Sequence, residues 1–502
     1  MTASAAALPQ QISDRDGVPV AVPYSKGLLY LIVAIGMGLR LATLSTPHVF
    51  YPDEIFQYLE AAHRLVFGPG VVPWEYREHI RSWLFPLMLA GPMWLGGSVA
   101  PASGAYLLLP KLCLLAFSTV AIWAAHSLGR RFSPLHGLFA LLIAATWYEP
   151  VYFSTVALTE PVATTAFLAG AALFYRARDN RGAHFLVAAG SLFTAACLIR
   201  FQYAPAAAVF VLIETARKPP QIVYLLTGAA PILLLSAVID LAMGAAPFGW
   251  LVENIRQNIL LGRSSLYGVS TWLYPLALVG VWKLWLMPML LLCWMGARRY
   301  PGLMLAALAN FAVHSLIGHK EYRFILLTTT LISILAAIGT ADAVQWLVRR
   351  SATDRARQFT WIAAGGWLLA SASIAATPPV RPWWSQQQAQ LAAFAALRDA
   401  TEACGISIYG FDWTETAGYT YLHRPVPLYV YDLNQRNAVM RDTPAFNRII
   451  QPATLAPAPG FAPERCFLGE GGPPICVYRR PGGCLGVIRQ TEINRRIIQL
   501  GR

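Results

Sequence analysis

Charge is scarce in this chain. Asp, Glu, Lys and Arg make up 13% of its 502 residues and hydrophobic residues 56%, whereas soluble domains carry about 25% charged residues. These proportions exclude an ordinary soluble protein and predict a polytopic membrane protein. The net charge is +14, but no polybasic run with interleaved aromatic residues is present, which argues against a nucleic-acid partner. The basic residues stand mainly in short loops between apolar segments, where they orient a chain among membrane lipids.

Motifs of nucleotide-dependent enzymes are also missing. The chain has no G-x-G-x-x-G after a strand and no G-x-x-x-x-G-K-[ST], so nothing indicates a nucleotide fold. No Asp-x-Asp stands in an expected outer loop, so no metal and no cofactor are expected, although a divalent cation would be compatible with the chemistry below. Residues 1–26 lack the basic start and short apolar core of a cleavable signal peptide, and we expect a disordered cytosolic tail.

Long apolar runs are what the chain has in abundance. Residues 27–377 are expected to form a helical transmembrane domain with about eleven crossings, since each run reaches the length that spans a bilayer. The expected spans are Gly27–Ser45, Ala105–Leu128, Leu135–Tyr152, Val156–Tyr175, Ala183–Arg200, Phe201–Ala216, Pro220–Met243, Trp272–Met295, Leu303–Ile317, Ile325–Leu347 and Phe359–Ala376.

Basic loops between these runs predict the orientation. They place the N-terminus in the cytosol and three loops outside it, at residues 47–82, 244–271 and 318–324. Trp83–Pro101 is apolar, but counting it as a crossing would put the later basic loops outside. We therefore expect this segment to dip into the membrane or lie along it, as a helix broken by Pro86, Pro92 and the Gly96–Gly97 pair.

The composition changes after Ala376. Residues 378–502 contain strand-like runs between turns rich in Pro and Gly, which predicts a small soluble α/β domain on the extracytoplasmic side. Its four cysteines are Cys404, Cys466, Cys476 and Cys484. Disulfides are expected there; three full pairings are open, and either Cys466–Cys476 or Cys476–Cys484 would close a short loop. A zinc site is the alternative, although the usual C-x₂₋₄-C spacing is absent.

An acid pair opens the first candidate site. Asp53 and Glu54 follow an apolar run directly. A purely structural explanation is that Asp53 caps the helix that begins after Pro52. A functional role for the pair is favoured by the many charged and aromatic residues in the same loop. We expect two amphipathic helices on the membrane surface with polar faces toward a cleft, to which Gln57, Glu75 and Arg81 would contribute.

A basic cluster forms the second candidate site. His319, Lys320 and Arg323 lie within five residues on the same predicted side of the membrane, which is typical of a phosphate site. The alternative is a girdle of long side chains anchored among lipid headgroups. The loop from Glu253 to Gly268 adds Arg263 and Tyr267 from an expected interfacial helix.

Ionisable residues near the ends of spans complete the candidates. Lys111, Glu160 and Arg200 all fall near the outer side, where they would either line the cavity or reach into the headgroup region. Lys283 falls inside an expected span and suggests that this helix begins later along the chain. Together these groups predict a cavity with a carboxylate at one wall and cations at another.

That cavity suits the transfer of a sugar from a polyprenyl phosphate. Cations would stabilise the negative charge that develops on the leaving phosphate. A carboxylate opposite them would accept the proton of the attacking hydroxyl. One base and one cationic site are sufficient for a single displacement with inversion.

The motifs resemble a known family. "YPDEIFQYLEAAHRLVFGPG", "LLGRSSLYGVSTWLYP" and "GHKEYRFIL" are similar to three loop motifs of glycosyltransferase family 22, the dolichyl/polyprenyl-phosphate-mannose-dependent mannosyltransferases. The resemblance covers most of Gly27–Leu347. It implies the type C membrane glycosyltransferase fold, a polyprenyl-phosphate-linked donor and a lipid or glycan acceptor on the non-cytosolic face.

The resemblance also implies roles for individual residues. Asp53 would be the general base, and Glu54 beside it would either orient the acceptor or shape the loop. His319, Lys320 and Arg323 would lie near the donor phosphate, which Arg263 of the Glu253–Gly268 loop is also expected to bind. One departure is that Tyr51 stands where the family commonly has a histidine.

Two other classes of protein compete with an enzyme. A transporter or flippase would show paired half-repeats with broken helices, and no such repeat is visible. A non-catalytic scaffold would leave the acid pair and the basic cluster unexplained. The Ala- and Arg-rich, lysine-poor composition suggests a bacterial inner membrane protein.

Overall fold

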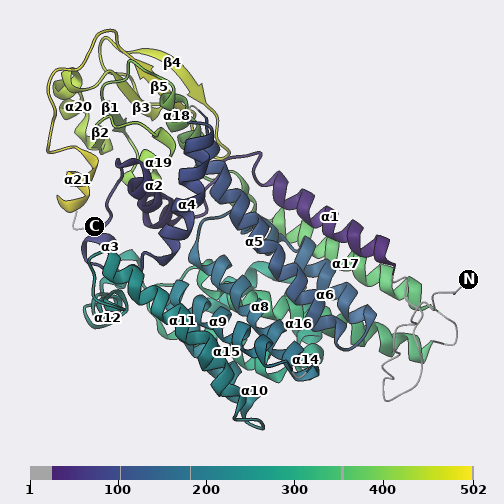
Figure 1. Ribbon diagram of the computed structural model, residues 1–502. Coiled ribbons are helices and arrows are strands. Elements are labelled where there is room, and N and C mark those ends of the chain that lie inside the picture. The colour runs from purple at the N-terminus through teal and green to yellow at the C-terminus, as the bar shows by residue number, and fades with distance from the viewer. Residues whose placement is uncertain (1–24, 102, 181, 352–354, 500–502) are drawn as a thin grey trace, which may run out of the picture.

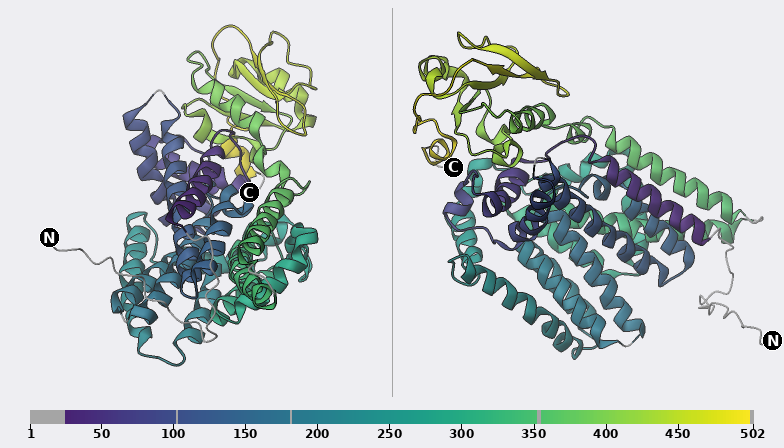
Figure 2. Two further views of the ribbon diagram at one scale, coloured as in Figure 1. Left: turned by 90° about the vertical axis from the view of Figure 1, so that its right-hand side faces the viewer. Right: turned by 45° about the horizontal axis from the view of Figure 1, so that its top comes forward.

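The structure is a long helical body with a small sheet at one end. This computed structural model describes residues 25–101, 103–180, 182–351 and 355–499, so nearly all of the predicted cytosolic tail lies outside the described residues. The views in Figures 1 and 2 agree that the sheet region sits at the end of the body where α2 and α3 lie, with the start of α1 toward the opposite end.

The predicted apolar runs form helices. The helices of the body are α1 (Lys26–Ala42), α4 (Leu84–Val99), α5 (Ala105–Arg130), α6 (Pro134–Thr146), α7 (Tyr148–Tyr152), α8 (Thr159–Asn180), α9 (Ala183–Ile199), α10 (Ala204–Thr215), α11 (Gln221–Ala242), α14 (Leu286–Ala297), α15 (Pro301–Leu316), α16 (Leu326–Arg350) and α17 (Ala356–Ala375). In the described part of the chain, four helical segments have the length and apolar character of membrane spans: Ala105–Arg130, Gln221–Ala242, Tyr274–Ala297 and Tyr322–Arg350.

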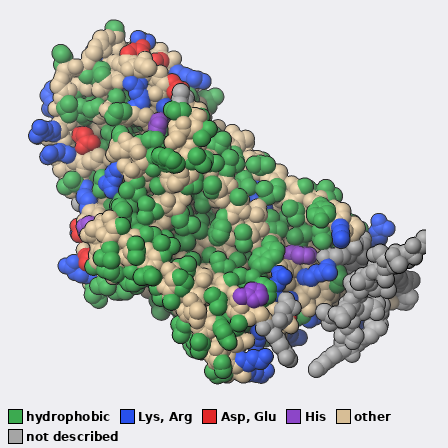
Figure 3. Space-filling view, in the orientation of Figure 1, with side chains coloured by type: hydrophobic (Ala, Val, Ile, Leu, Met, Phe, Trp, Pro, Cys, Tyr) green, Lys and Arg blue, Asp and Glu red, His purple; other side chains and the backbone are tan. Residues whose placement is uncertain are grey.

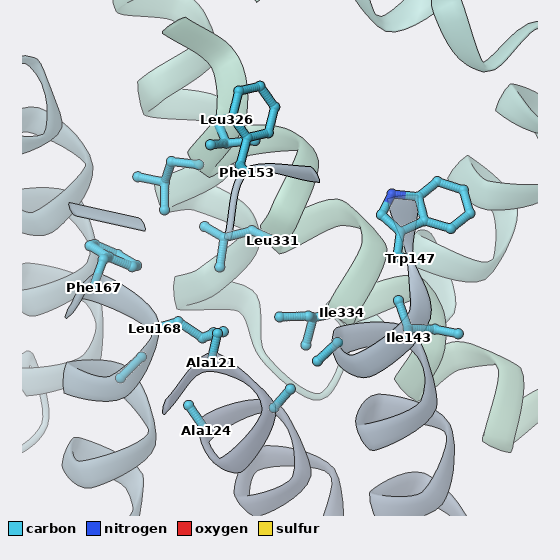
Figure 4. Close-up of a cluster of buried hydrophobic side chains, with 14 of the residues drawn as sticks. Ala121, Ala124, Ile143, Trp147, Phe153, Phe167, Leu168, Leu326, Leu331 and Ile334 are labelled. Carbon is cyan, nitrogen blue, oxygen red and sulfur yellow. The ribbon is translucent and has the colours of Figure 1, made fainter. Parts of the chain in front are cut away.

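Helix α16 runs through the core of the body. Nearly all of its apolar side chains are buried, and Leu331 and Ile334 pack with residues of α5, α6 and α8 in one hydrophobic cluster (Figure 4). Small residues let the neighbouring helix α14 come close, since a Cβ on Gly339 would lie 1.9 Å from the carbonyl oxygen of Leu292. Such close helix contact is typical of membrane bundles.

Two predicted segments differ from expectation. Trp83–Pro101 is not broken, because α4 runs unbroken from Leu84 to Val99 despite Pro92. Conversely, the run Trp272–Met295 is interrupted: α13 (Tyr274–Val279) is followed by a short 3-10 turn, and Lys283 has φ 47° before α14 begins at Leu286. The late helix start that Lys283 suggested is therefore confirmed.

The first outer loop is buried rather than laid on a surface. A π-helical turn, η1 (Glu54–Leu59), continues into α2 (Glu60–Phe67), and every residue from Glu54 to His63 is buried. Helix α3 (Trp74–Arg77) is a single turn. Where two amphipathic helices with polar faces toward a cleft were expected, the C-terminal region covers this loop, as the hydrogen bonds of Glu60 with Tyr419 and Thr420 show.

The C-terminal region has the predicted α/β character. Its mixed sheet has the order β2-β1-β3-β5-β4, with β1 parallel to β2 and β3 and with β5 antiparallel to β3 and β4. The strands are β1 (Ile406–Tyr409), β2 (Leu428–Tyr431), β3 (Arg448–Pro452), β4 (Ala462–Phe467) and β5 (Ile475–Arg479), and the helices are α18 (Gln388–Arg398), α19 (Gly418–Leu422), α20 (Arg436–Asp442) and α21 (Ile493–Gln499).

The four cysteines of this region form two disulfides. Cys466 pairs with Cys476, directly across β4 and β5, and Cys404 pairs with Cys484. One of the two predicted short loops is thus present and the other, Cys476–Cys484, is not. No cluster of metal-ligating side chains occurs among the described residues, so the zinc alternative finds no site there.

Apolar side chains cover the helical body. Figure 3 shows hydrophobic side chains spread over most of one face, with charged side chains gathered toward its two ends. This distribution is what a protein embedded in a bilayer requires.

Candidate active site

Arg323 and Asp53 meet at the centre of the candidate site. Asp53 precedes η1, and Arg323 lies in the short turn η6 (Tyr322–Ile325) between α15 and α16. The guanidinium of Arg323 donates to Asp53, and it also donates to Glu321 Oε2 at 2.6 Å. Its Nε lies 3.6 Å from Glu160 Oε1. One buried arginine therefore contacts three carboxylates from three separate segments.

Asp53 does not cap the helix that follows it. Its side chain makes no capping hydrogen bond, so helix capping does not explain this acid. The ring of Tyr51, which replaces the usual histidine, lies under the Arg323 guanidinium with its centroid 4.8 Å from Cζ. Tyr51 therefore helps to orient Arg323 through a cation–π contact.

His319 and Glu321 extend this network. His319 Nε2 lies 2.7 Å from Glu321 Oε1, and its Nδ1 lies 3.3 Å from the carbonyl oxygen of Gly268. The hydrogen bond with Glu321 raises the pKa of His319. Burial alone would raise the pKa of Glu321, but the charge of Arg323 and the bond with His319 outweigh burial and lower it. Both shifts favour the charged forms of the two side chains.

Lys320 is a cation that forms no ion pair with a carboxylate among the described residues. Its Nζ donates to backbone carbonyls only, those of Ser270 at 3.1 Å, Gly318 at 3.4 Å and Ile317, among the described residues. Lys320 lines a cavity together with Tyr51, Glu321 and Lys283. The positive charge in this cavity is therefore available to an anion.

A second, more polar cavity lies at the other end of the ion-pair chain. Arg200 lies 3.3 Å from Glu160, which connects it to Arg323. Arg200, Arg81, Tyr58 and Thr159 line this smaller cavity. The two cavities have no lining residue in common. The predicted cavity is thus two cavities joined by the chain of ion pairs.

Glu54 is held by hydrogen bonds from the backbone. It is fully buried and accepts from the backbone nitrogens of Phe50 and Ala157, each at 3.2 Å. Burial raises its pKa, while the charge of Lys111 acts in the opposite direction. Neither Glu54 nor Lys111 is among the residues that line the two cavities.

Gln57 and Glu75 contact each other beside the site. Gln57 Nε2 donates to Glu75 Oε1 at 2.8 Å, and burial raises the pKa of Glu75 to about 7. Arg263 and Tyr267 instead tie the second outer loop to the first. Trp74 Nε1 donates to Tyr267 at 2.5 Å, and Arg263 lies 3.5 Å from Glu78. The predicted donor-phosphate residue Arg263 thus lies in an ion pair outside both cavities.

One buried acid was not identified from the sequence. Glu149 of α7 is fully buried and accepts hydrogen bonds from Trp147 Nε1 at 3.2 Å and from the hydroxyl of Tyr322. Its signal was present, since an acid inside an apolar run is unusual enough to indicate a role.

Comparisons with known proteins agree with this architecture. Residues 29–400 match the model of the Alg9-like mannosyltransferase family. GPI mannosyltransferase 3 of Yarrowia lipolytica is 30% identical over 342 residues, which cover 63% of this chain and 63% of that protein. GPI alpha-1,2-mannosyltransferase 3 of Homo sapiens is 26% identical over 296 residues, covering 55% of this chain and 51% of that protein. The chain thus spans less than two thirds of the length of these relatives.

The fold is also found in a solved structure. The crystal structure of ArnT from Cupriavidus metallidurans bound to undecaprenyl phosphate has a TM-score of 0.58 with this chain at 13% identity, covering 92% of this chain and 100% of that one. The chain therefore has the type C glycosyltransferase fold, as predicted.

Proposed function

This chain belongs to the Alg9-like mannosyltransferase family, and from that premise we propose that it transfers mannose from a polyprenyl-phosphate-linked donor to a lipid or glycan acceptor. The relatives act, by their names, as GPI mannosyltransferases, which favours a glycolipid acceptor. The ArnT structure contains undecaprenyl phosphate, which favours a polyprenyl phosphate carrier. The observation that carries the proposal is the Asp53–Arg323 contact, which brings the acid of the first outer loop to the basic cluster.

Asp53 is the proposed general base. The acceptor hydroxyl attacks the anomeric carbon as its proton passes to Asp53, and the bond from that carbon to the phosphate oxygen breaks with both electrons leaving on the phosphate. Arg323 is already engaged by three carboxylates, so its proposed role is to position Asp53. Lys320 and His319 are then the proposed partners of the donor phosphate, with Lys320 the stronger candidate because no carboxylate neutralises it.

The orientation follows from the same proposal. The three loops that build the site are those that the basic-loop pattern places outside the cytosol. The reaction is therefore proposed for the non-cytosolic face, with the N-terminus in the cytosol and the sheet domain outside it. A bacterial inner membrane stays a prediction from composition alone.

The proposal is tested by donor choice. Purified full-length protein in lipid nanodiscs is incubated with radiolabelled polyprenyl-phosphate mannose or GDP-mannose and with an extract of membrane glycolipids. We expect label to pass to a glycolipid from the polyprenyl donor only. Transfer from GDP-mannose alone would overturn the proposed donor.

A further inference from the structure

The smaller cavity contains two arginines whose Nε atoms lack hydrogen-bond partners. Arg200 is 7% exposed, and its Nε has no hydrogen-bond partner. The Nε of Arg81 is likewise buried without a partner. Both residues line the same cavity. Buried donors are rarely left unsatisfied in proteins, so this cavity is built to receive an acceptor of hydrogen bonds.

The charges around the cavity indicate an anion. Arg200 has one acidic contact, Glu160 at 3.3 Å, and that carboxylate is shared with Arg323. Arg81 feels the charges of Glu75 and Asp53, but it forms no ion pair with either among the described residues. A guanidinium presents a planar set of donors that suits the oxygens of a phosphate. Two such groups at one small cavity favour a phosphoryl group over a neutral ligand.

We propose that the Arg81–Arg200 cavity binds a phosphoryl group carried by the acceptor. This inference rests on the proposed function, in which the donor phosphate occupies the cavity at Lys320. In an inverting displacement the leaving group and the attacking hydroxyl lie on opposite faces of the sugar carbon. The two cavities share no lining residue, so a donor at Lys320 leaves the Arg81–Arg200 cavity to the acceptor. The acceptor is then an anionic glycolipid.

Inorganic phosphate is a direct probe of this site. In a Lys320→Gln background, which removes the other proposed phosphate site, phosphate should raise the thermal unfolding temperature of the full-length protein. Arg81→Gln or Arg200→Gln should weaken that binding at least tenfold, and Arg81→Lys should restore part of it. Arg256→Gln is the matched control, because in the described part of the chain this exposed arginine pairs only with Glu253. Equal phosphate binding in all of these variants would overturn the proposal.

Inhibition kinetics separate the acceptor from the donor. In the protein with Lys320 intact, phosphate bound at Arg81 and Arg200 should raise the KM for the glycolipid acceptor, and Arg81→Gln should abolish this competition. Competition with the donor alone, lost in Arg81→Gln, would assign the cavity to the donor and overturn the inference. If no transfer occurs but phosphate binding still depends on Arg81, the proposed function fails while the anion site stands.

Discussion

Asp53 and Arg323 lie 270 positions apart in the sequence and form an ion pair in which the arginine is buried and the aspartate half-buried. The same guanidinium contacts Glu321 and Glu160, so a single cation holds acids from the first outer loop, the later outer loop and α8 together. In our account this arrangement fixes the direction in which Asp53 faces the acceptor hydroxyl.

Replacing Arg323 tests that positioning role. Arg323→Gln leaves three carboxylates without their shared cation, and loss of a partner in a buried ion pair costs about 3–5 kcal/mol. We expect a lower unfolding temperature and a lower kcat, with little change in the KM for the donor. Arg323→Lys should regain part of kcat because it keeps the charge. An unchanged kcat in Arg323→Gln would show that Asp53 needs no such support.

Lys320 should determine affinity for the donor. Lys320→Gln removes charge-assisted contacts worth about 1.5–3 kcal/mol, so the KM for polyprenyl-phosphate mannose should rise by about tenfold or more while the fold is unaffected. Lys283→Gln is the comparison variant, because Lys283 is a second lysine that lines the same cavity. Donor kinetics that are unchanged in Lys320→Gln would move the donor phosphate elsewhere.

Glu60 should attach the C-terminal region to the loop that carries Asp53. Its carboxylate accepts from the backbone nitrogens of Tyr419 at 2.6 Å and Thr420 at 2.8 Å and from the Thr420 hydroxyl at 2.5 Å. In Glu60→Gln the amide nitrogen would face these donors, and hydrogen exchange near residues 418–422 should accelerate. Glu470→Gln, at an exposed pair with Arg381, should behave as wild type. Equal protection in both variants would contradict this role.

Glu75 should make stability depend on pH. Burial raises its pKa from 4.5 to about 7, so the folded state resists the ionisation that the unfolded state undergoes. The free-energy cost of ionising Glu75 in the folded state is absent below the pKa that Glu75 has in the unfolded state. This cost grows as pH rises and is complete above about pH 7, where it approaches about 3 kcal/mol. Relative to Glu75→Gln, the wild type should therefore lose stability between pH 5 and pH 8. Parallel stability curves for the two proteins would contradict the shift.

Local features of this fold were predictable from the sequence. Apolar runs identify the helices because spanning length and hydrophobicity are properties of consecutive residues. Lys283 is a charged residue inside such a run, and it marks the break before α14. The Cys466–Cys476 bond closes a short loop and was among the predicted pairs.

Contacts between distant segments were not predictable in the same way. Nothing local shows that Arg323 is shared by three acids, or that the sheet domain buries η1 and α2 through Glu60. The Cys404–Cys484 disulfide joins residues 80 positions apart and was equally unpredictable from local sequence. Glu149 was visible as an acid in an apolar run, but its partner Tyr322 lies 173 positions away.

Turnover by Asp53→Asn tests the central claim most directly. The substitution removes the proposed base with little change in volume, and Asp399→Asn, at an exposed pair with Arg398, is the control. With polyprenyl-phosphate mannose and a glycolipid acceptor, kcat should fall by about 10²–10⁴-fold in Asp53→Asn and remain at the wild-type value in Asp399→Asn. Wild-type turnover by correctly folded Asp53→Asn protein would contradict the account.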